Sequence, residues 1–296
     1  MRIKHQETME GSTQFSDALE SGKFITTVEL RPPKGTDMSE FFRKADYVRD
    51  LASALNVTDG CRARMHVSPL AAASLLKQKG FEMIYQITCR DKNRIALQSD
   101  LLGASVLGIE NILVLGGDHP LLGDHPDAKP VYDLDTIQLL NAVVSLSRGK
   151  DLSGKELKGL PHFFVGAVVN PNCEPLELQL LMMEKKVRAG AKFFQTQPIF
   201  DIKTYRKFHR RTKNLDVKVI AGVLLLRSAK QAATLNTIPG IRIPERYIKR
   251  LQRTSEPLDT GIAITREIID SLREFADGVH IMAVGREEVI PQLFQN

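Results

Sequence analysis

The sequence predicts a single (β/α)8 barrel of the α/β class, and three observations favour it. Eight short apolar runs that read as strands alternate with helix-period segments along the chain. No shift in composition and no Ser/Gly-rich linker divides residues 1–296 into separate domains. Three of the runs lead to an acid or an amide, at Glu29, Asp118 and Gln197, and barrel enzymes carry their active sites at such strand tips.

The expected elements are short and are bounded by turn residues. The strands cover residues 24–29, 55–58, 83–88, 112–115, 163–169, 193–195, 217–222 and 279–283. The helices cover residues 39–55, 71–79, 93–108, 135–147, 174–189, 202–211, 228–235, 244–252 and 261–275. Ser39 and Asp135 are expected to cap the helices that they open, and Gly80 and Gly108 fall just past helix ends. Residues 1–20 form an N-terminal extension, and residues 148–161 read as an exposed insertion.

A doubly wound sheet is the alternative architecture. However, no GxGxxG follows the first strand, and the chain has no Walker-type loop. With 296 residues, 43% of them hydrophobic, the chain is long enough to bury the core of a barrel as one domain.

Composition excludes several classes of protein. The formal charge of +6 suits an anionic ligand, but the basic residues are dispersed and Trp is absent, which argues against nucleic acid. Cys61, Cys89 and Cys173 are too few and too scattered for a disulfide framework or a zinc or cluster site. No apolar run approaches 18 residues, and residues 1–14 are polar, so we expect a cytoplasmic protein without a membrane span.

Glu29 is the first candidate for chemistry. It ends a β-branched run, and Pro32 and Pro33 stiffen the backbone that follows. A partly buried carboxyl group at a strand tip is suited to general acid catalysis. The alternative is a structural salt bridge to Arg31 or to another cation of the barrel mouth.

The loop after the fourth strand is the second candidate region. Gly116 and Gly117 allow the backbone to approach a planar or phosphorylated ligand closely. Two Gly-Asp-His-Pro repeats, at residues 117–120 and 123–126, invite a metal-site interpretation. Each histidine precedes a proline and no third ligand has a fixed spacing, so we expect no metal.

The remaining candidate site residues are basic and lie near the end of a predicted helix and around the last predicted strand. Lys185 and Lys186 lie late in the helix at residues 174–189, where they either complement the helix dipole or hold a phosphate. His280 and Arg286 bracket the last strand and its exit. Arg286 is suited either to gripping a carboxylate or to closing the barrel.

Taken together, these motifs resemble those of methylenetetrahydrofolate reductases. They occur in the family's order at residues 28–33 (VELRPP), 58–60 (TDG), 115–118 (LGGD), 185–191 (KKVRAGA) and 195–201 (QTQPIFD). The resemblance runs from about residue 23 to residue 293. Residues 90–104 resemble a branch of the family found in acetogens and related organisms.

The resemblance implies a role for each matching residue. Glu29 matches the general acid that protonates the folate, so that its one-carbon bridge opens to a reactive iminium. Asp118 matches an acid near flavin and folate that favours the cationic intermediate. Gln197 matches the amide that orients the folate, and Arg286 matches a residue that contacts it. The basic surface is consistent with a polyglutamylated folate.

The resemblance also implies a flavin, with FAD expected and FMN as the alternative. The aligned flavin positions are Thr58, Gln86, Gly117, Asp118, Tyr132 and Lys186. The flavin would carry the hydride, and the protein would supply position and proton. The electron donor is either NAD(P)H or a reductant held by a partner subunit with a metal or iron–sulfur group, and we expect an oligomer.

Departures from the family pattern keep two other functions open. Gln86 replaces a common histidine, Gly116 an arginine, and Gln179 and Met182 stand where phosphate-binding residues occur. Ala229 replaces an aromatic residue that stacks the nicotinamide in some members. One alternative is a flavin-holding electron-relay subunit without independent turnover. Another is an aldolase or lyase with a phosphate site.

Overall fold

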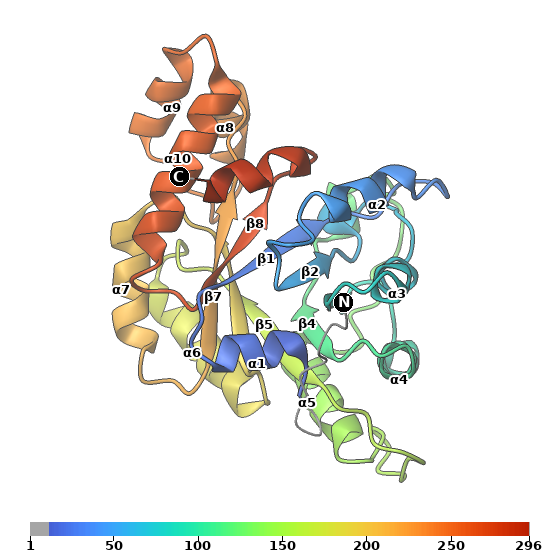
Figure 1. Ribbon diagram of the computed structural model, residues 1–296. Coiled ribbons are helices and arrows are strands. Elements are labelled where there is room, and N and C mark those ends of the chain that lie inside the picture. Colours follow the sequence, from blue (N-terminus) through green and yellow to red (C-terminus); the bar gives the residue numbers. More distant parts are fainter. Residues whose placement is uncertain (1–11, 296) are drawn as a thin grey trace, which may run out of the picture.

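A closed barrel of eight parallel strands forms the centre of the protein in the computed structural model, which describes residues 12–295 (Figure 1). The strands pair in chain order, and β8 pairs back with β1. They are β1 (Ile25–Leu30), β2 (Ala54–Val57), β3 (Met83–Thr88), β4 (Asn111–Leu115), β5 (Phe164–Val169), β6 (Phe193–Pro198), β7 (Lys218–Leu224) and β8 (Gly278–Met282). The predicted (β/α)8 barrel is confirmed.

Helices follow the strands and cover the outside of the barrel (Figure 1). They are α1 (Gln14–Glu20), α2 (Ser39–Asp46), α3 (Pro69–Gln78), α4 (Arg94–Val106), α5 (Thr136–Ser147), α6 (Leu176–Arg188), α7 (Ile202–Thr212), α8 (Ala229–Leu235), α9 (Glu245–Gln252) and α10 (Pro257–Leu272). Short 3-10 helices are η1 (Cys61–Ala63), η2 (Pro120–Leu122) and η3 (Glu287–Phe294). No helix within residues 12–295 is long and apolar enough to cross a membrane.

The first helix after β1 differs from its prediction. α2 ends at Asp46, because the N–H groups of Val48, Arg49 and Leu51 bond three residues back instead of four. Ser39 does not cap this helix. The Asp37 carboxylate instead accepts the Ser39 N–H at 2.9 Å.

The other three residues predicted to mark helix ends, Asp135, Gly80 and Gly108, are confirmed. Asp135 forms a capping box with Gln138 at the start of α5. Gly80 and Gly108 follow α3 and α4 with φ of 84° and 72°, the left-handed conformation in which glycine ends helices.

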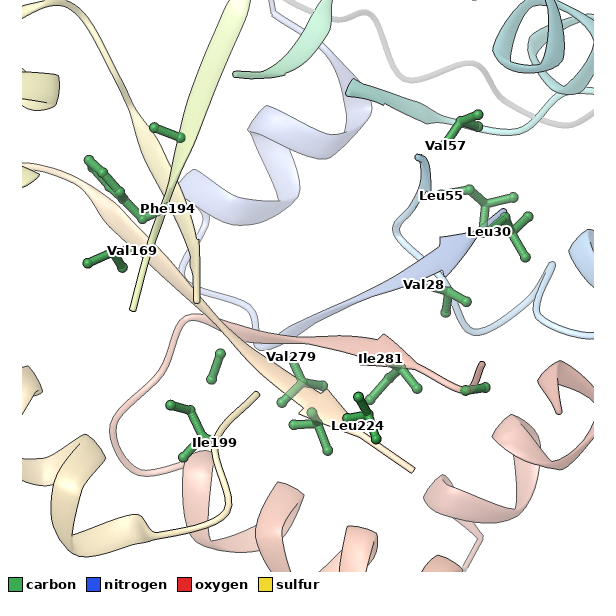
Figure 2. Close-up of a cluster of buried hydrophobic side chains, with 14 of the residues drawn as sticks. Val28, Leu30, Leu55, Val57, Val169, Phe194, Ile199, Leu224, Val279 and Ile281 are labelled. Atoms are coloured by element: carbon green, nitrogen blue, oxygen red, sulfur yellow. The ribbon is translucent and has the colours of Figure 1, made fainter. Parts of the chain in front are cut away.

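The apolar core has two parts, one outside the strands and one inside them. The larger lies between the strands and the surrounding helices, and Figure 2 shows part of it, including Val28 and Leu30 of β1. The smaller fills the amino end of the barrel interior. Its members are Phe15, Leu19, Ile25, Ala54, Ile84, Leu113, Phe193 and Ile220. Ile25 and Val28 thus belong to different parts of the core, as expected from side-chain alternation along a strand.

Helix α1 closes the amino end of the barrel and was missed by the sequence prediction, which left residues 1–20 as an extension. Thr13 and Ser16 form its capping box, and the Thr13 hydroxyl donates to Oδ1 of Asn111 at 2.6 Å. Phe15 is fully buried and packs edge-on against Phe164 and Phe193. Residues 1–11 of the expected extension lie outside the described residues.

Candidate active site at the carboxyl end of the barrel

The predicted site residues lie at or near the carboxyl ends of the strands, except Lys186, which is on a helix. A closed parallel barrel presents these ends at one mouth. The residues are Glu29 in β1, Thr58 after β2, Gln86 in β3, Gly117 and Asp118 after β4, Tyr132 before α5, Lys186 in α6, Gln197 in β6 and Arg286 after β8.

Glu29 lies one residue before the end of β1, and its side chain is 18% exposed. Its Oε2 is 4.0 Å from Nε2 of His280. Arg31 contacts Cys61 instead, with Nη2 donating to the sulfur at 3.6 Å, and its Nε is buried without an acceptor. Within residues 12–295, Glu29 therefore forms no ion pair with Arg31, and its carboxyl group remains partly open to the mouth.

Four buried polar side chains from four strands form a hydrogen-bonded chain that leads to Glu29. The side-chain amides of Asn56 and Gln195 form two hydrogen bonds with each other, of 2.8 and 3.1 Å. Nε2 of Gln195 also donates to Oγ1 of Thr27 at 3.4 Å. The same hydroxyl bonds Nδ1 of His280 at 2.9 Å. The chain ends at the other ring nitrogen of His280, which faces Glu29.

Asp118 joins two loops of the mouth through both its side chain and its backbone. Its carboxylate accepts the Arg62 N–H at 2.9 Å, and its carbonyl accepts Nη1 of Arg90 at 3.3 Å. The same Arg90 nitrogen donates to the Gly60 carbonyl at 3.1 Å. Hydrogen bonding to Asp91 raises the pKa of Arg90, which keeps this buried guanidinium charged. Arg90 therefore ties the β2–α3 loop to the β4–α5 loop.

Two glycines permit this close approach. Gly117 has a φ of 87°, and a Cβ there would lie 2.9 Å from Cβ of Arg90 and 3.1 Å from Cβ of Thr88. A Cβ on Gly60 would lie 2.3 Å from Nη2 of Arg90. The Tyr132 hydroxyl donates to the Gly117 carbonyl at 3.1 Å, so the loop is also fixed from its far side. Only glycine fits either position without moving the loop.

The pKa of Cys61 depends on the charges of three neighbouring side chains, Glu29, Arg31 and Asp118. Burial is the main cause that raises the pKa of Cys61 to about 11, and Glu29 and Asp118 add to it while Arg31 opposes it. A thiol with this pKa is neutral at physiological pH and is a poor nucleophile. Glu29 and Asp118 therefore act electrostatically on one shared part of the mouth.

Polar groups without a protein partner occur next to β2 and β3. Oγ1 of Thr58 is buried and has no hydrogen-bond partner among residues 12–295. The buried Gln86 side chain makes no hydrogen bond within the described part of the chain. The neighbouring Asp59 is satisfied, since it accepts from both the N–H and the hydroxyl of Thr88, and burial raises the pKa of Asp59. Thr58 and Gln86 thus retain bonding capacity for a ligand.

Lys186 brings a half-buried positive charge near the end of β5. Its Nζ donates to the Val168 carbonyl at 2.8 Å, and burial lowers the pKa of Lys186. Among residues 12–295 no carboxylate pairs with it, whereas its neighbour Lys185 is exposed to solvent. A buried cation without a counter-ion is suited to an anionic group of a ligand.

A β-bulge re-aims the tip of β6, where Gln197 is exposed. The register with β7 shifts between Gln195 and Pro198. Oγ1 of Thr196 accepts the Gly222 N–H at 2.9 Å and donates to the Gln197 carbonyl at 2.7 Å. A Cβ on Gly222 would lie 2.3 Å from the Thr196 carbonyl oxygen, so β7 needs a glycine opposite the bulge. Bulges commonly orient side chains next to active sites.

Arg286 stands on a tight turn after β8. Val284 and Gly285 have φ of 53° and 86°, and the buried Glu287 accepts the Gly285 N–H at 2.9 Å. Arg286 itself is half-buried and donates through Nε to Glu288. Its backbone position is therefore fixed, while a carboxylate of the protein occupies one side of its guanidinium.

The Asp–His pairs of the β4–α5 loop take part in local structure. Asp124 accepts from Lys34 and from the Met65 N–H, which ties the loop to two others, and Lys34 lowers the pKa of Asp124. Nδ1 of His119 accepts the Leu121 N–H at the start of η2. Within residues 12–295, no three His, Cys, Asp or Glu side chains are grouped so that they could hold a metal ion.

Sequence reasoning missed Arg90, Asp59 and most of the polar chain. A signal for the chain was present, because Thr27, Asn56 and Gln195 interrupt apolar strands at positions whose neighbours face outward. Arg90 carried a weaker signal, since it lies two residues past the end of a strand and precedes an acid. Only the fold shows that Gly60 and Asp118 lie on either side of it.

Comparison with known proteins finds relatives that share one name. The chain is 25% identical over 299 residues to 5,10-methylenetetrahydrofolate reductase of Pectobacterium carotovorum subsp. carotovorum, an alignment that covers 98% of this chain and 95% of that one. It is 25% identical to the Escherichia coli (strain K12) protein of the same name, with 90% and 88% covered. Among solved structures, oxaloacetate acetylhydrolase matches with a TM-score of 0.51 at 9% identity, covering 95% of this chain and 82% of that one. This structural likeness shows the barrel fold alone.

The family profile described as methylenetetrahydrofolate reductase matches residues 14–296, which is almost the whole chain. The match includes every predicted site residue, from Glu29 to Arg286. The protein is therefore an enzyme of the oxidoreductase class, and the chain belongs to the methylenetetrahydrofolate reductase family.

Proposed function

We propose that this protein reduces 5,10-methylenetetrahydrofolate to 5-methyltetrahydrofolate with a bound flavin, and that Glu29 is the general acid. The observation that carries the proposal is the mouth of the barrel, where a partly exposed Glu29 shares its electrostatic surroundings with Asp118. The names of the relatives in Pectobacterium and Escherichia coli support the same reaction.

The residues present fit a flavin. Within the residues that the structure describes, Oγ1 of Thr58 is a buried polar atom without a partner, and the side-chain amide of Gln86 makes no hydrogen bond. Gly117 lets the backbone come close to a planar ring. Lys186 supplies a cation without a counter-ion, which suits a phosphate. These features fit FAD and FMN alike, since both carry a phosphate on the ribityl chain, and the family resemblance makes FAD the first choice.

When bound, the flavin supplies hydride transfer. Glu29 delivers a proton to the folate, so that the one-carbon bridge opens. The Asp118 carboxylate stabilises the positive charge that develops on the folate, because it is exposed at the same mouth. Gln197 orients the pterin through its amide, and Arg286 binds another polar part of the folate.

The electron donor separates this proposal from a second one, in which the chain is a flavin-holding relay subunit. Ala229, the first residue of α8, packs against the apolar core and offers no aromatic surface to a nicotinamide. Aromatic stacking adds about 0.5–1.5 kcal/mol beyond area burial. We therefore propose that the isolated chain uses NADH and NADPH poorly, and that a partner subunit with a metal or iron–sulfur group supplies electrons.

A visible spectrum of the purified protein, followed by mass identification of the released chromophore, tests the flavin. The expected result is a yellow protein with flavin near unit stoichiometry. A colourless protein that binds no added flavin would contradict both proposals and favour an aldolase or lyase.

Stopped-flow flavin reduction by each nicotinamide, compared with folate turnover driven by reduced viologen, tests the donor. We expect slow reduction by NADH and NADPH and efficient turnover with viologen. Fast, saturable reduction by NADH at sub-millimolar concentration would instead indicate a self-sufficient enzyme.

A further inference from the structure

The interior of the barrel changes from apolar to polar along its axis. At the amino end it is filled by apolar side chains such as Ile25 and Ala54. Two residues further along the same strands, Thr27 and Asn56 are polar and fully buried, and they bond to partners on β6 and β8. A buried polar group costs stability unless it is hydrogen-bonded, so this layer is a built network.

The hydrogen bonds of Gln195 and Thr27 favour one protonated nitrogen of the His280 ring. Gln195 uses its carbonyl oxygen to accept from Asn56, so its amide nitrogen is the group that donates to Thr27. The Thr27 hydroxyl accepts from Gln195 and lies 2.9 Å from Nδ1 of His280, so its own hydrogen is available to that nitrogen. A neutral imidazole whose Nδ1 accepts carries its hydrogen on Nε2. That nitrogen lies 4.0 Å from Oε2 of Glu29.

We propose that the Thr27–Gln195–Asn56 chain holds His280 as the Nε2–H tautomer, and that His280 is a positioning residue for Glu29. The inference rests on the proposed function, in which Glu29 donates the proton. The Nε2–H group faces the carboxyl group and moves into hydrogen-bond distance of the carboxylate after the proton has left. It thereby orients Glu29 and stabilises its ionised form.

The chain orients Glu29 and does not conduct protons to it. Its far end is the amide pair of Asn56 and Gln195, and amides do not release protons at physiological pH. Glu29 is reached from the mouth, since its side chain is partly exposed while all four members of the chain are at most 4% exposed.

Few other charges act at this position. Arg31, which directly follows β1, and Asp118 of the β4–α5 loop are charged, and both act on Cys61 next to Glu29. Cys61 itself is neutral because its pKa is about 11. On β7 the residue paired with His280 is Gly222, and on β2 the residue paired with Glu29 is Asn56, so neither strand adds a charge there.

NMR of the flavin-loaded protein with ¹⁵N-labelled histidine tests the tautomer without measuring activity. The chain has seven histidines, and His280→Gln identifies the signal of interest. We expect His280 in the Nε2–H form in the wild type and in Thr27→Ser, and a mixture of tautomers in Thr27→Val. Thr265→Val is the matched control, because Thr265 is equally buried and bonds only within α10. A predominantly Nδ1–H form in the wild type, or no change in Thr27→Val, would overturn the proposal.

The pH profile of folate reduction with reduced viologen tests the effect on Glu29. His280→Leu should lower the rate roughly 10–100-fold, as a misplaced catalytic group does. It should also move the basic limb of the profile to higher pH, because the carboxylate has lost a donor. His280→Gln keeps an N–H near the Nε2 position and should recover part of both effects. A lower rate with an unmoved limb would mean that His280 is only structural.

Glu29→Gln separates this inference from the proposed function. If Glu29→Gln retains near wild-type turnover, the assigned general acid is wrong. If it loses turnover while His280→Leu and Thr27→Val leave the rate and the basic limb unchanged, Glu29 remains the acid and only the role of His280 is refuted.

Discussion

The two ends of this barrel are built on opposite principles. The amino end is sealed by α1, and Phe15, Phe164 and Phe193 pack there ring against ring. The carboxyl end is lined by acids, amides and cations, and Arg90 and Gly117 hold its loops at short distances. The same eight strands connect the two ends.

The difference shows how one barrel separates stability from chemistry. Apolar contacts at the amino end are insensitive to charge and leave no polar atom in need of a ligand. At the mouth, Thr58 keeps a buried oxygen and Lys186 a cation, neither of which has a partner side chain in the described part of the chain. Changes at one end should therefore affect folding, and changes at the other should affect binding and turnover.

The largest effect is expected at the mouth, in Glu29→Gln. An isosteric amide cannot donate the proton, and general acid catalysis contributes roughly 10²–10⁴-fold. Folate turnover should fall by this factor, while the flavin content and the midpoint of urea unfolding stay at wild-type values. Flavin reduction by viologen is the control, and a parallel loss there would show that the variant damages the cofactor site.

At the amino end, Phe15→Ala should lower the free energy of unfolding by about 3–5 kcal/mol, because it removes a fully buried ring from an aromatic cluster. Urea unfolding measures the loss, and Leu178→Ala, on the exposed face of α6, is the control. Turnover per folded molecule should not change. A large loss of specific activity in folded Phe15→Ala would contradict the separation of the two ends.

Lys186→Met should weaken flavin binding roughly 10–100-fold, since a hydrogen bond to a charged group contributes about 1.5–3 kcal/mol. Methionine keeps the apolar part of this half-buried side chain, so the stability of the apoprotein should be retained. Fluorescence titration with flavin measures the affinity. Lys185→Met, on the exposed side of the same helix, should bind flavin like the wild type; equal weakening by both would indicate a general effect of charge.

The smallest effect is expected for Thr13→Ala, which removes the cap of α1 and its bond to Asn111. Loss of an N-cap costs about 1 kcal/mol. Hydrogen exchange should become faster in α1, with the barrel strands unaffected. Ser21→Ala, which removes an exposed hydroxyl bonded to the Ala18 carbonyl, is the control. Faster exchange throughout the barrel would mean that α1 unfolds together with it.

The sequence was informative about the strands and less so about the barrel's closure. The run at residues 83–88 coincides with β3, because β-branched and aromatic residues are bounded there by clear turn signals. Helix α1 escaped prediction because it is short, and its buried face shows only Phe15 and Leu19 as large apolar side chains. A short helix has little local signal and is stabilised by what it packs against.

For the site, too, local features were predictable and contacts between distant residues were not. The position of Glu29 and Asp118 at one mouth was predictable, because the strand tips of a barrel converge. The bonds of Gln195 to Asn56 and Thr27 were not, because they span 139 and 168 positions and depend on which strands face each other across the interior. The bonds of Arg90 were likewise not predictable, since its partners Gly60 and Asp118 lie about 30 residues away on either side.

The seal at the amino end also has a consequence for biosynthesis. Helix α1 leaves the ribosome well before its ring partners Phe164 and Phe193 are made. The Phe15 ring therefore remains exposed until β6 has emerged from the ribosome. One edge of β1 remains unpaired longer still, until β8 has emerged. Contacts between such distant segments slow folding and expose apolar surface meanwhile. A nascent chain halted before residue 193 should thus engage chaperones through its first helix.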